Sequence, residues 1–542
     1  MSLSVGVAEV GKGPPTSRTN VSGPPVRLYP MTNSPEVDST MPGSDPRRWL
    51  LLATVGVGIF LITLDNTVLY TALPTTVEEL DASSSQMLWI VNAYPVVICG
   101  LLLGTGTLGD KIGHRRMFIT GLTIFGIASL IGGFAPNVGM LISARVLLAV
   151  GAAIMMPATL ALIRHTFHDP QEMNLAIGIW ASLSTVAAAL GPLVGGVLLE
   201  FFRWGSVFFM NVPIVIAGLV VLPFVSHPDQ PDPSRTWDLR SSIQAMIMLV
   251  SVVLLIKELA HRPQNWWIVG IAIVAAVVFA FRFVRRQNRL THPLLTFDIF
   301  RIPAFLAGVL GASLSLFAVV GFEFLTTQQL QLTEGFTPLH AGAYVTIIAV
   351  GSMLTSVIAG KNLNRFGLRI LIPGGMGVGA VGAAIAMVGS ALSSHPIMLL
   401  GMFIMGAGLG GTMAVASIAM IGSAPRHRAG MASSVEEVSY ELGSLLSVAV
   451  LGSAVTLFYS LFYDANRPTN TADLPGFDPS VARDSVAGAL HQASQIADPQ
   501  LAQQIADVAK AAYANSYSVT LIVIVVVLAA GSLYSRKLLR PR

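Results

Sequence analysis

The sequence is poor in charged residues and almost without cysteine. Only 11% of its 542 residues are Asp, Glu, Lys or Arg, and Cys99 is the one cysteine. A single thiol excludes a disulfide framework and a cysteine-based metal site. The chain also lacks the HExxH zinc motif and the GxxxxGK[ST] phosphate loop, and its ten histidines are scattered, mostly in loops or tails. We therefore expect no catalytic residues, no bound metal and no cofactor.

Apolar residues dominate instead. They make up 53% of the chain, and the mean hydropathy is +0.69, outside the range of soluble globular domains. A helix needs about 20 such residues to cross a bilayer. That requirement predicts an all-α polytopic membrane protein with fourteen spans, at about 49–73, 86–108, 117–135, 138–163, 174–199, 206–225, 241–259, 266–284, 303–328, 340–360, 370–391, 396–421, 430–462 and 517–535.

The basic residues indicate how the chain is oriented. They fall in alternate loops and at both ends, whereas the opposite short loops hold little beyond Arg203 and Arg262. The positive-inside rule makes the basic loops cytoplasmic, and an even number of spans places both termini on that side. The net charge of +4 therefore reflects topology and does not indicate a nucleic-acid partner.

Two similar stretches indicate an internal repeat. GTLGDKIGHR begins at Gly106, after the second predicted span, and GKNLNRFGLR begins at Gly360, after the tenth. Repeats packed around a midplane site are the architecture of secondary transporters. The predicted parts are a disordered cytoplasmic tail (1–46), an N-terminal six-helix half (47–225), two linking helices with their loops (226–302), a C-terminal half (303–535) carrying an outer helical hairpin (464–516), and a cytoplasmic tail (536–542).

Three glutamates interrupt the thirteenth predicted span. An ionised side chain at the bilayer centre costs roughly 2.5–3.5 kcal/mol, so intramembrane carboxylates usually have a function. Glu437 and Glu441 are four residues apart and share one helical face with Ser444, whereas Glu436 points about 100° away. Their face is expected to line a cavity between the halves. The alternative is a buried network of ion pairs, which is more plausible for Glu436 than for the other two.

Further charged residues lie within other predicted spans. Asp65 lies about 16 residues, or roughly 24 Å, into the first span. It could instead cap the outer end of that helix. Arg145, in the fourth span, cannot lose its proton and needs a carboxylate or several carbonyls, unless it extends to the membrane surface. Glu323, in the ninth span, is either a cation contact near the exit or a solvated residue at the mouth.

Small residues in the fifth span favour close packing of helices, and one loop has residues that could hold the cytoplasmic side closed. Ala187, Gly191 and Gly195 are spaced by four and form a stripe that lets another helix approach, while Pro192 can bend the helix. In the first repeated loop, Asp110 can accept hydrogen bonds from a neighbouring helix N-terminus or pair with Arg115. Such contacts would hold the cytoplasmic side closed, although positive-inside topology also explains part of the basic charge.

These stretches resemble the major facilitator superfamily, in particular its fourteen-helix drug:proton antiporters such as the exporters of quaternary ammonium compounds. The resemblance covers nearly the whole chain after residue 46. It implies two pseudo-symmetric six-helix halves plus two linking helices, and proton-coupled export of lipophilic cations through a bacterial plasma membrane. The stretches that carry it are LDNTVLYTALP (64–74), GTLGDKIGHRR (106–116), ARVLLAVGAAIMMP (144–157), AAALGPLVGG (187–196) and the helix of the three glutamates.

The resemblance also implies roles for individual residues. It assigns proton and cation binding to Asp65 and Glu437, with Glu441 as a supporting or substrate-contacting acid. Asp110, Arg115, Arg145, Gly191 and Pro192 are expected to act in coupling and gating.

The chain departs from the family at LWIVNAYPV, where Asn92 stands in place of a common aspartate, and at Gly351-Ser352, where some members have an aspartate. Fewer negative charges put the handling of dicationic substrates in doubt. Asn92 and Glu323 are still expected among the residues that bind the proton or the substrate. Cation-π and adaptable apolar contacts are expected from a few aromatic and sulfur-containing residues, although each is individually more typical of ordinary packing. A monomer is expected. The alternatives are an exporter of a lipid or an endogenous metabolite, and a membrane-embedded enzyme. The candidate contact residues are Trp89, Tyr94, Trp180, Phe317, Phe322, Met353, Met413 and Tyr440.

Overall fold

The computed structural model describes most of the chain after residue 46. The tail 1–46 lies outside the described residues, as do Arg262 and three arginines of the basic loops, Arg235, Arg426 and Arg428. The described ranges are 47–167, 169–226, 229, 231, 237–260, 264–290, 293–424, 429–467, 477–496 and 498–540.

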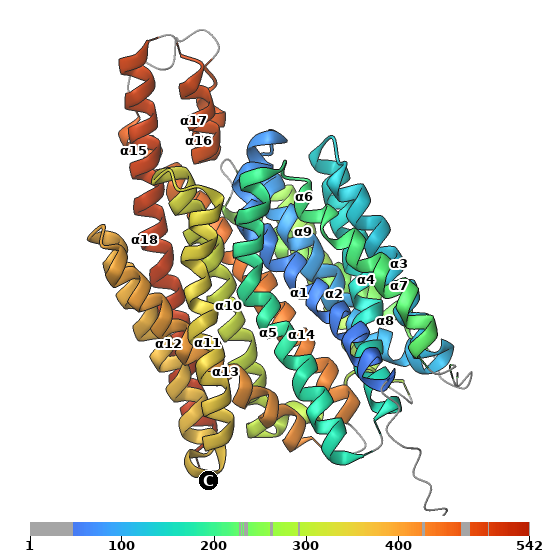
Figure 1. The fold of residues 1–542 in the computed structure, drawn as a ribbon. Coiled ribbons are helices and arrows are strands. Elements are labelled where there is room, and N and C mark those ends of the chain that lie inside the picture. Colours follow the sequence, from blue (N-terminus) through green and yellow to red (C-terminus); the bar gives the residue numbers. More distant parts are fainter. Residues whose placement is uncertain are drawn as a thin grey trace, which may run out of the picture. The chain divides into compact units, whose positions relative to one another are not determined.

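Helices form almost the whole of these ranges, which contain no strand (Figure 1). The N-terminal half consists of α1 (Arg47–Glu79), α2 (Ser84–Ile112), α3 (His114–Gly133), α4 (Val138–Thr166), α5 (Pro170–Phe201), α6 (Ser206–Phe209) and α7 (Asn211–Val225). The linking pair is α8 (Leu239–Ala260) and α9 (Trp266–Gln287). The C-terminal half consists of η1 (Phe297–Arg301), α10 (Pro303–Gln328), η2 (Gln329–Thr333), α11 (Pro338–Phe366), α12 (Leu368–Ala391), α13 (His395–Ser423), α14 (Ala429–Ser447), η4 (Val448–Gly452), α15 (Ser453–Asn466), α16 (Pro479–Asp484), α17 (Val486–Ser494) and α18 (Pro499–Leu538).

The number of spans agrees with the hydropathy of the sequence. Within the described ranges, thirteen helical segments are long and apolar enough to cross a membrane, counting α6 with α7, and α14 with η4 and α15, as one each. The fourteenth is α5, whose 32 residues include the shorter apolar segment Val186–Phe201. The predicted all-α membrane fold is confirmed.

The two halves repeat the same packing. In the N-terminal half α1 contacts α4, α5 and α7, and α3 contacts α4 and α7; in the C-terminal half α10 contacts α13, α14 and α18, and α12 contacts α13 and α18. The repeated loops match as well. Gly113 (φ +101°) separates α2 from α3, and Gly367 (φ +70°) separates α11 from α12, at the same position of the two similar stretches. Glycine adopts such left-handed conformations at little cost, which explains its place in both loops.

The halves meet through two related pairs of helices. α5 packs against α11, and α2 packs against α14. Glycines allow the first contact, because a Cβ atom on Gly196 would meet the backbone of Pro338 and Leu339, and one on Gly342 would meet the carbonyl group of Pro192.

The linking helices contact the bundle mainly through one member of the pair. α8 packs against α2, α15 and η4, whereas the principal contacts of α9 are with α8. Much of α9 is consequently exposed, including Ile271, Val274 and Phe281, and an apolar helix in this position faces lipid.

The C-terminal end differs from the expected pattern of a separate hairpin and final span. Asp498 caps the helix that Pro499 begins, because its side chain accepts a hydrogen bond from the Gln500 N–H. The helix does not end near residue 516, however, and α18 continues for 40 residues into the last span. The part of α18 before residue 517 is less apolar than the span that follows it. It is rich in Ala and Gln, however, which favour helix, so the helix continues without a break.

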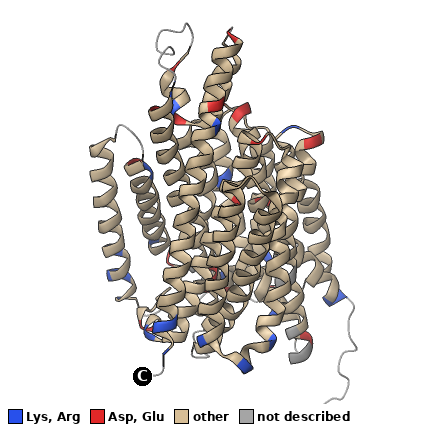
Figure 2. Cartoon of the chain, turned by 90° about the vertical axis from the view of Figure 1, so that its left-hand side faces the viewer, with Lys and Arg blue, Asp and Glu red and all other residues tan. Residues whose placement is uncertain are grey.

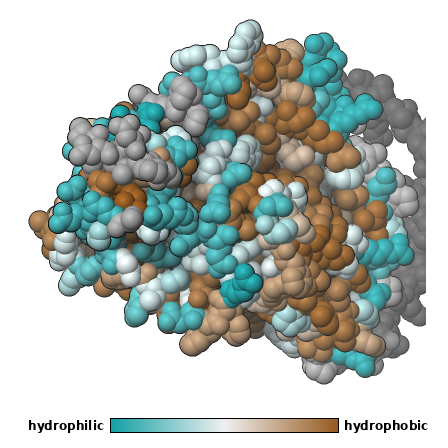
Figure 3. All heavy atoms as spheres, turned by 90° about the horizontal axis from the view of Figure 1, so that it is seen from above, coloured by the Kyte–Doolittle hydropathy of each residue, from teal (hydrophilic) through white to brown (hydrophobic). Residues whose placement is uncertain are grey.

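Charge is distributed unequally along the bundle. In Figure 2, Lys and Arg gather at the lower end, where α1 begins, and Asp and Glu at the upper end, with a few acidic residues in between. We call these the basic end and the acidic end. Seen from the acidic end, hydrophilic surface lies beside large areas of apolar surface (Figure 3). The positive-inside rule predicts that the basic end is cytoplasmic.

Candidate functional site

A buried ion pair joins α1 to α4. Arg145 Nη1 donates to Asp65 Oδ2 at 2.8 Å, and the two residues are 0% and 3% exposed. Arg145 also donates to the Ile90 carbonyl at 3.2 Å and to Asn66 Oδ1 at 3.4 Å. This burial excludes a snorkelling arginine. Asp65 does not cap the outer end of its helix either, because α1 continues to Glu79.

Asn211 completes the environment of Asp65, and sequence reasoning missed it. Its Nδ2 atom donates to Asp65 Oδ1 at 2.8 Å and to Ser129 Oγ at 3.2 Å. Asn211 is fully buried at the start of α7, and Ser129 lies on α3. Four helices of the N-terminal half therefore position one carboxylate. The only sequence signal was a polar residue between the apolar stretches of α6 and α7.

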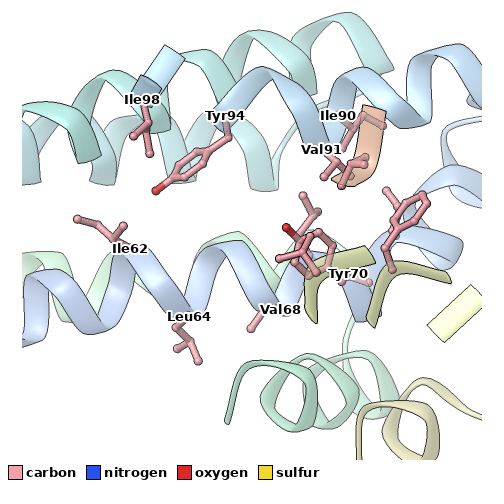
Figure 4. Close-up of a cluster of buried hydrophobic side chains, with 14 of the residues drawn as sticks. Ile62, Leu64, Val68, Tyr70, Ile90, Val91, Tyr94 and Ile98 are labelled. Carbon is pink, nitrogen blue, oxygen red and sulfur yellow. The ribbon is translucent and has the colours of Figure 1, made fainter. Parts of the chain in front are cut away.

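α2 brings an aromatic ring and an amide to the same region. The Arg145 guanidinium carbon lies 4.5 Å from the centroid of the Tyr94 ring, a cation-π arrangement. Figure 4 shows Tyr94 extending from α2 towards α1. No described group hydrogen-bonds to the Tyr94 hydroxyl or to either amide atom of Asn92, although both residues are 0% exposed. Buried polar groups without partners are costly, so the Tyr94 hydroxyl and the Asn92 amide are candidates for binding a water molecule or a substrate.

α14 places its acidic face against the N-terminal half. Glu441 lies close enough to Arg145 for their charges to interact, and no described group hydrogen-bonds to its Oε2 atom. Glu437 lies one helical turn away, partly buried, and its charge interacts with that of Glu441. Ser444, on the same face, lies 3.4 Å from the Tyr70 hydroxyl of α1. Charged side chains of both halves thus meet at one interface.

The other predicted residues of this region have different neighbours. Glu436 lies beside Ser417 of α13 and does not share the face of Glu437. The Tyr440 hydroxyl donates to the Met413 carbonyl of α13 at 3.4 Å. Trp89 packs in an apolar cluster with residues of α8, α14 and η4.

The remaining aromatic and methionine candidates are spread over the bundle. Trp180 donates to Thr159 Oγ1 at 3.1 Å, Phe317 and Phe322 are buried in the core, and Met353 is 51% exposed on α11. They lie on three different helices, α5, α10 and α11.

Glu323 lies on α10, where the C-terminal half contacts α1. It is 4% exposed, which excludes a solvated residue at the mouth. One turn further along, Thr327 donates to the Tyr70 carbonyl at 3.2 Å, and Gln331 donates to the Thr71 carbonyl at 3.0 Å. These bonds join the two halves along the part of α1 nearest the acidic end.

The small-residue stripe of α5 packs against α1. A Cβ atom on Gly191 would meet Thr67, and one on Gly195 would meet the backbone of Val68. The Pro192 carbonyl, on another face of α5, lies against Gly342 of α11. α5 therefore contacts the first helix of its own half and the opposite half through adjacent residues.

At the basic end, Asp229 holds the N-terminus of α3. Its carboxylate accepts from the backbone N–H groups of Arg115 at 2.8 Å and Arg116 at 3.1 Å. Asp110 was expected to bind a helix N-terminus or Arg115, but it lies 3.2 Å from His114 Nε2. Asp229 makes the contact that sequence reasoning had assigned to Asp110.

No described group of three His, Cys, Asp or Glu residues could hold a metal ion. Two repeated helical bundles with buried charges at their interface define a secondary transporter. The sequence pattern of the Major Facilitator Superfamily matches residues 55–327 and 322–463, and the chain belongs to this family. It is a multi-pass membrane transporter and not an enzyme.

Several proteins are similar over most of their length. The multidrug efflux pump LfrA of Mycolicibacterium smegmatis is 35% identical over 90% of this chain and 95% of its own. The methyl viologen resistance protein SmvA of Salmonella typhimurium is 34% identical over 88% and 95%. The tetracenomycin C resistance and export protein of Streptomyces glaucescens is 30% identical over 78% and 79%.

A solved structure has the same fold. A bacterial homolog of the human lysosomal transporter Spinster, in an inward-facing and occupied conformation, aligns with a TM-score of 0.62 at 17% identity. The alignment covers 91% of this chain and 98% of that one.

Proposed function

We propose that this chain is a proton-coupled antiporter that exports lipophilic cations, such as quaternary ammonium compounds and dyes, by alternating access. The observation that carries the proposal is the acidic face of α14. Glu437 and Glu441 lie on α14, which packs against α2 of the other half, and no described residue forms a salt bridge with either. The names of the relatives, a multidrug efflux pump and a methyl viologen resistance protein, support export of drugs and cations.

Desolvation provides the coupling. A carboxylate in a partly dehydrated cavity resists ionisation, so it can hold a proton at a pH where a solvated carboxylate would not. A bound cation favours the ionised form and displaces the proton. Proton and drug therefore compete for Glu437, and Glu441 supports the site. In the N-terminal half, Asp65 interacts with Arg145, which also lies near Glu441, so its protonation alters the charge at the same interface.

Alternating access follows from the way in which the halves are joined. Contacts at Tyr70, Thr71 and Gly342 join the halves towards the acidic end. Rocking of the halves would break these contacts and open the site there. In this proposal the basic end faces the cytoplasm, as the positive-inside rule predicts, and a monomer carries out export from a bacterial cell.

The charge of the substrate determines whether the pH gradient alone or also the membrane potential drives transport. Exchange of one proton for one monovalent cation is electroneutral and is driven by the pH gradient alone. An additional proton would add about 2.3 kcal/mol per 100 mV of membrane potential. Methyl viologen is a dication, so acceptance of that compound by this chain would show that Asn92 does not exclude two positive charges.

The test is transport of ethidium, a fluorescent lipophilic monocation, into energised inverted vesicles. Wild-type protein is compared with Asp65→Asn and Glu437→Gln, each with and without a protonophore. Glu200→Gln is the matched control, because Glu200 is an exposed carboxylate at the end of α5.

We expect both site variants to lose more than 10-fold in rate and the protonophore to abolish wild-type transport, while Glu200→Gln remains active. Equal ethidium gradients in all of these conditions would refute proton-coupled cation export and favour a lipid or metabolite substrate.

A further inference from the structure

A basic groove lies between the linking helices, away from the site described above. It has a volume of about 830 Å³ and is lined by α8 and α9 near the basic end of the bundle. Four arginines contribute to it, together with apolar residues of α9 and one amide of α8. The transport mechanism uses none of these residues.

The groove is held open by contacts at its end. Arg286 forms a two-point ion pair with Asp238, with Nε–Oδ2 and Nη2–Oδ1 distances of 2.9 and 2.7 Å. Gln287 donates to Ser241 Oγ at 2.7 Å and accepts from the Leu294 N–H at 2.8 Å. These bonds fix the end of α9 against the start of α8, so the groove is formed before any ligand binds.

The remaining arginines are free to bind a ligand. Arg282, Arg285 and Arg289 are exposed, and none of them forms an ion pair with a carboxylate of the described chain. The Arg285 guanidinium carbon lies 6.0 Å from the centroid of the Phe281 ring, which holds it near the groove. Three unpaired guanidinium groups favour an anion, and planar guanidinium groups match the geometry of a phosphate.

The wall of the groove is apolar and faces lipid. Val274, Val278, Phe281, Arg285 and Arg289 follow one another at spacings of three or four residues and form one stripe along α9, of which all but Val274 line the groove. The first three members are exposed apolar side chains, 62%, 41% and 62% exposed. An acyl chain can lie along these residues while a phosphate binds the two arginines that follow.

Gln244 of α8 adds a polar contact inside the groove. Its Oε1 atom is buried, and no described group donates to it. A hydroxyl of a glycerol headgroup can donate there. A phosphate beside arginines and a hydroxyl beside an amide together describe phosphatidylglycerol better than a free anion or a zwitterionic lipid.

We propose that the groove between α8 and α9 is a binding site for an anionic glycerophospholipid, which fixes the otherwise peripheral α9 to the bundle. Basic pockets between transmembrane helices are known to bind anionic headgroups. Positive-inside topology alone would explain basic residues at this end of α9, but it does not require three of them to line one groove with an apolar wall.

The test measures phosphatidylglycerol binding to the full-length detergent-solubilised protein by native mass spectrometry. The variant is Arg282→Gln/Arg285→Gln/Arg289→Gln. The matched control is Lys361→Gln/Arg365→Gln/Arg369→Gln, which removes three exposed positive charges from α11 and α12, outside the groove. The corresponding triple change of the groove arginines to lysine tests whether the charge alone is sufficient.

Each arginine near an anionic lipid headgroup contributes about five-fold in affinity, so the glutamine variant is expected to bind roughly 100-fold more weakly. The control is expected to bind as the wild type does, and the lysine variant to lose less than about 10-fold. Dioleoyl phosphatidylcholine is expected not to compete.

Three results would overturn the proposal. The first is equal binding by the wild type and the glutamine variant. The second is an equal loss in the control, which would show a general effect of charge. The third is full displacement of the lipid by millimolar inorganic phosphate, which would show an anion site that does not use the acyl chain.

Discussion

Asn211 allows a quantitative test of how the N-terminal half holds its carboxylate. Replacement by Ala removes one hydrogen bond to Asp65, at 2.8 Å, and one to Ser129, at 3.2 Å. A buried hydrogen bond to a charged group contributes about 1.5–3 kcal/mol, and a neutral one about 0.5–1.5 kcal/mol. Because the ion pair with Arg145 remains, the free energy of unfolding should fall by about 2–4 kcal/mol.

Asn211→Asp separates electrostatics from packing. It places a second carboxylate next to Asp65, and two like charges about 4 Å apart repel by about 4 kcal/mol at an effective dielectric constant of 20. This variant should be less stable than Asn211→Ala at pH 8. It should recover at pH 5, because one proton shared by the two carboxylates relieves the repulsion.

The assay is denaturant unfolding in detergent at pH 8 and pH 5, followed by tryptophan fluorescence. Asn362→Ala is the control, since the Asn362 amide donates to the Ile358 carbonyl of its own helix, and less than about 0.5 kcal/mol should be lost. Equal stability of wild type and Asn211→Ala, or an Asp variant insensitive to pH, would refute the reasoning.

Three further predictions test other contacts. Asp65→Asn and Arg145→Gln should each lower the free energy of unfolding by about 3–5 kcal/mol. The double variant should lose at least about 2 kcal/mol less than the sum of the two single losses, as measured in unfolding assays. Additive losses would contradict a coupled pair. Gly342→Val should slow ethidium transport at least 10-fold with unchanged expression, because its Cβ would meet a carbonyl of α5; normal transport would exclude this close approach. Burial alone would raise the pKa of Asp238, but hydrogen bonds from Arg286 and Ser241 outweigh it and hold the pKa below its usual value. The stability that this pair contributes, about 1 kcal/mol, is therefore present above pH 4 and lost as the pH falls below it, and Asp238→Asn should remove that pH dependence of unfolding.

The spans and the repeat could be predicted because each depends on local sequence. Membrane-crossing helices follow from apolar runs of sufficient length, and the two loops share glycines that both adopt positive φ, Gly113 and Gly367. The proximity of Asp65 and Arg145 was also accessible, since a buried arginine needs a carboxylate and few were available within the spans. In each case the residues that determine the feature can be recognised within short stretches of sequence.

Other features depend on contacts between distant segments. Asn211 is one polar residue at the start of an apolar helix, and only the packing of α7 on α1 and α3 brings it to Asp65. Asp229 could not be assigned to α3, because its loop has no periodic pattern that gives its direction. The length of α18 was missed because a hydropathy criterion detects the membrane core and does not detect where a helix ends.

Because α18 is continuous, a movement of its membrane span is transmitted to its end outside the membrane. At 1.5 Å per residue, its 40 residues extend about 60 Å, roughly twice the thickness of the hydrocarbon core. Tilting a helix of this length by about 10° displaces one end relative to the other by roughly 10 Å. Tyr517 links α18 to α10 through a 2.9 Å hydrogen bond between its hydroxyl and Thr326 Oγ1. A small rotation of α10 is therefore magnified outside the membrane, where a spectroscopic label near Pro499 would report it.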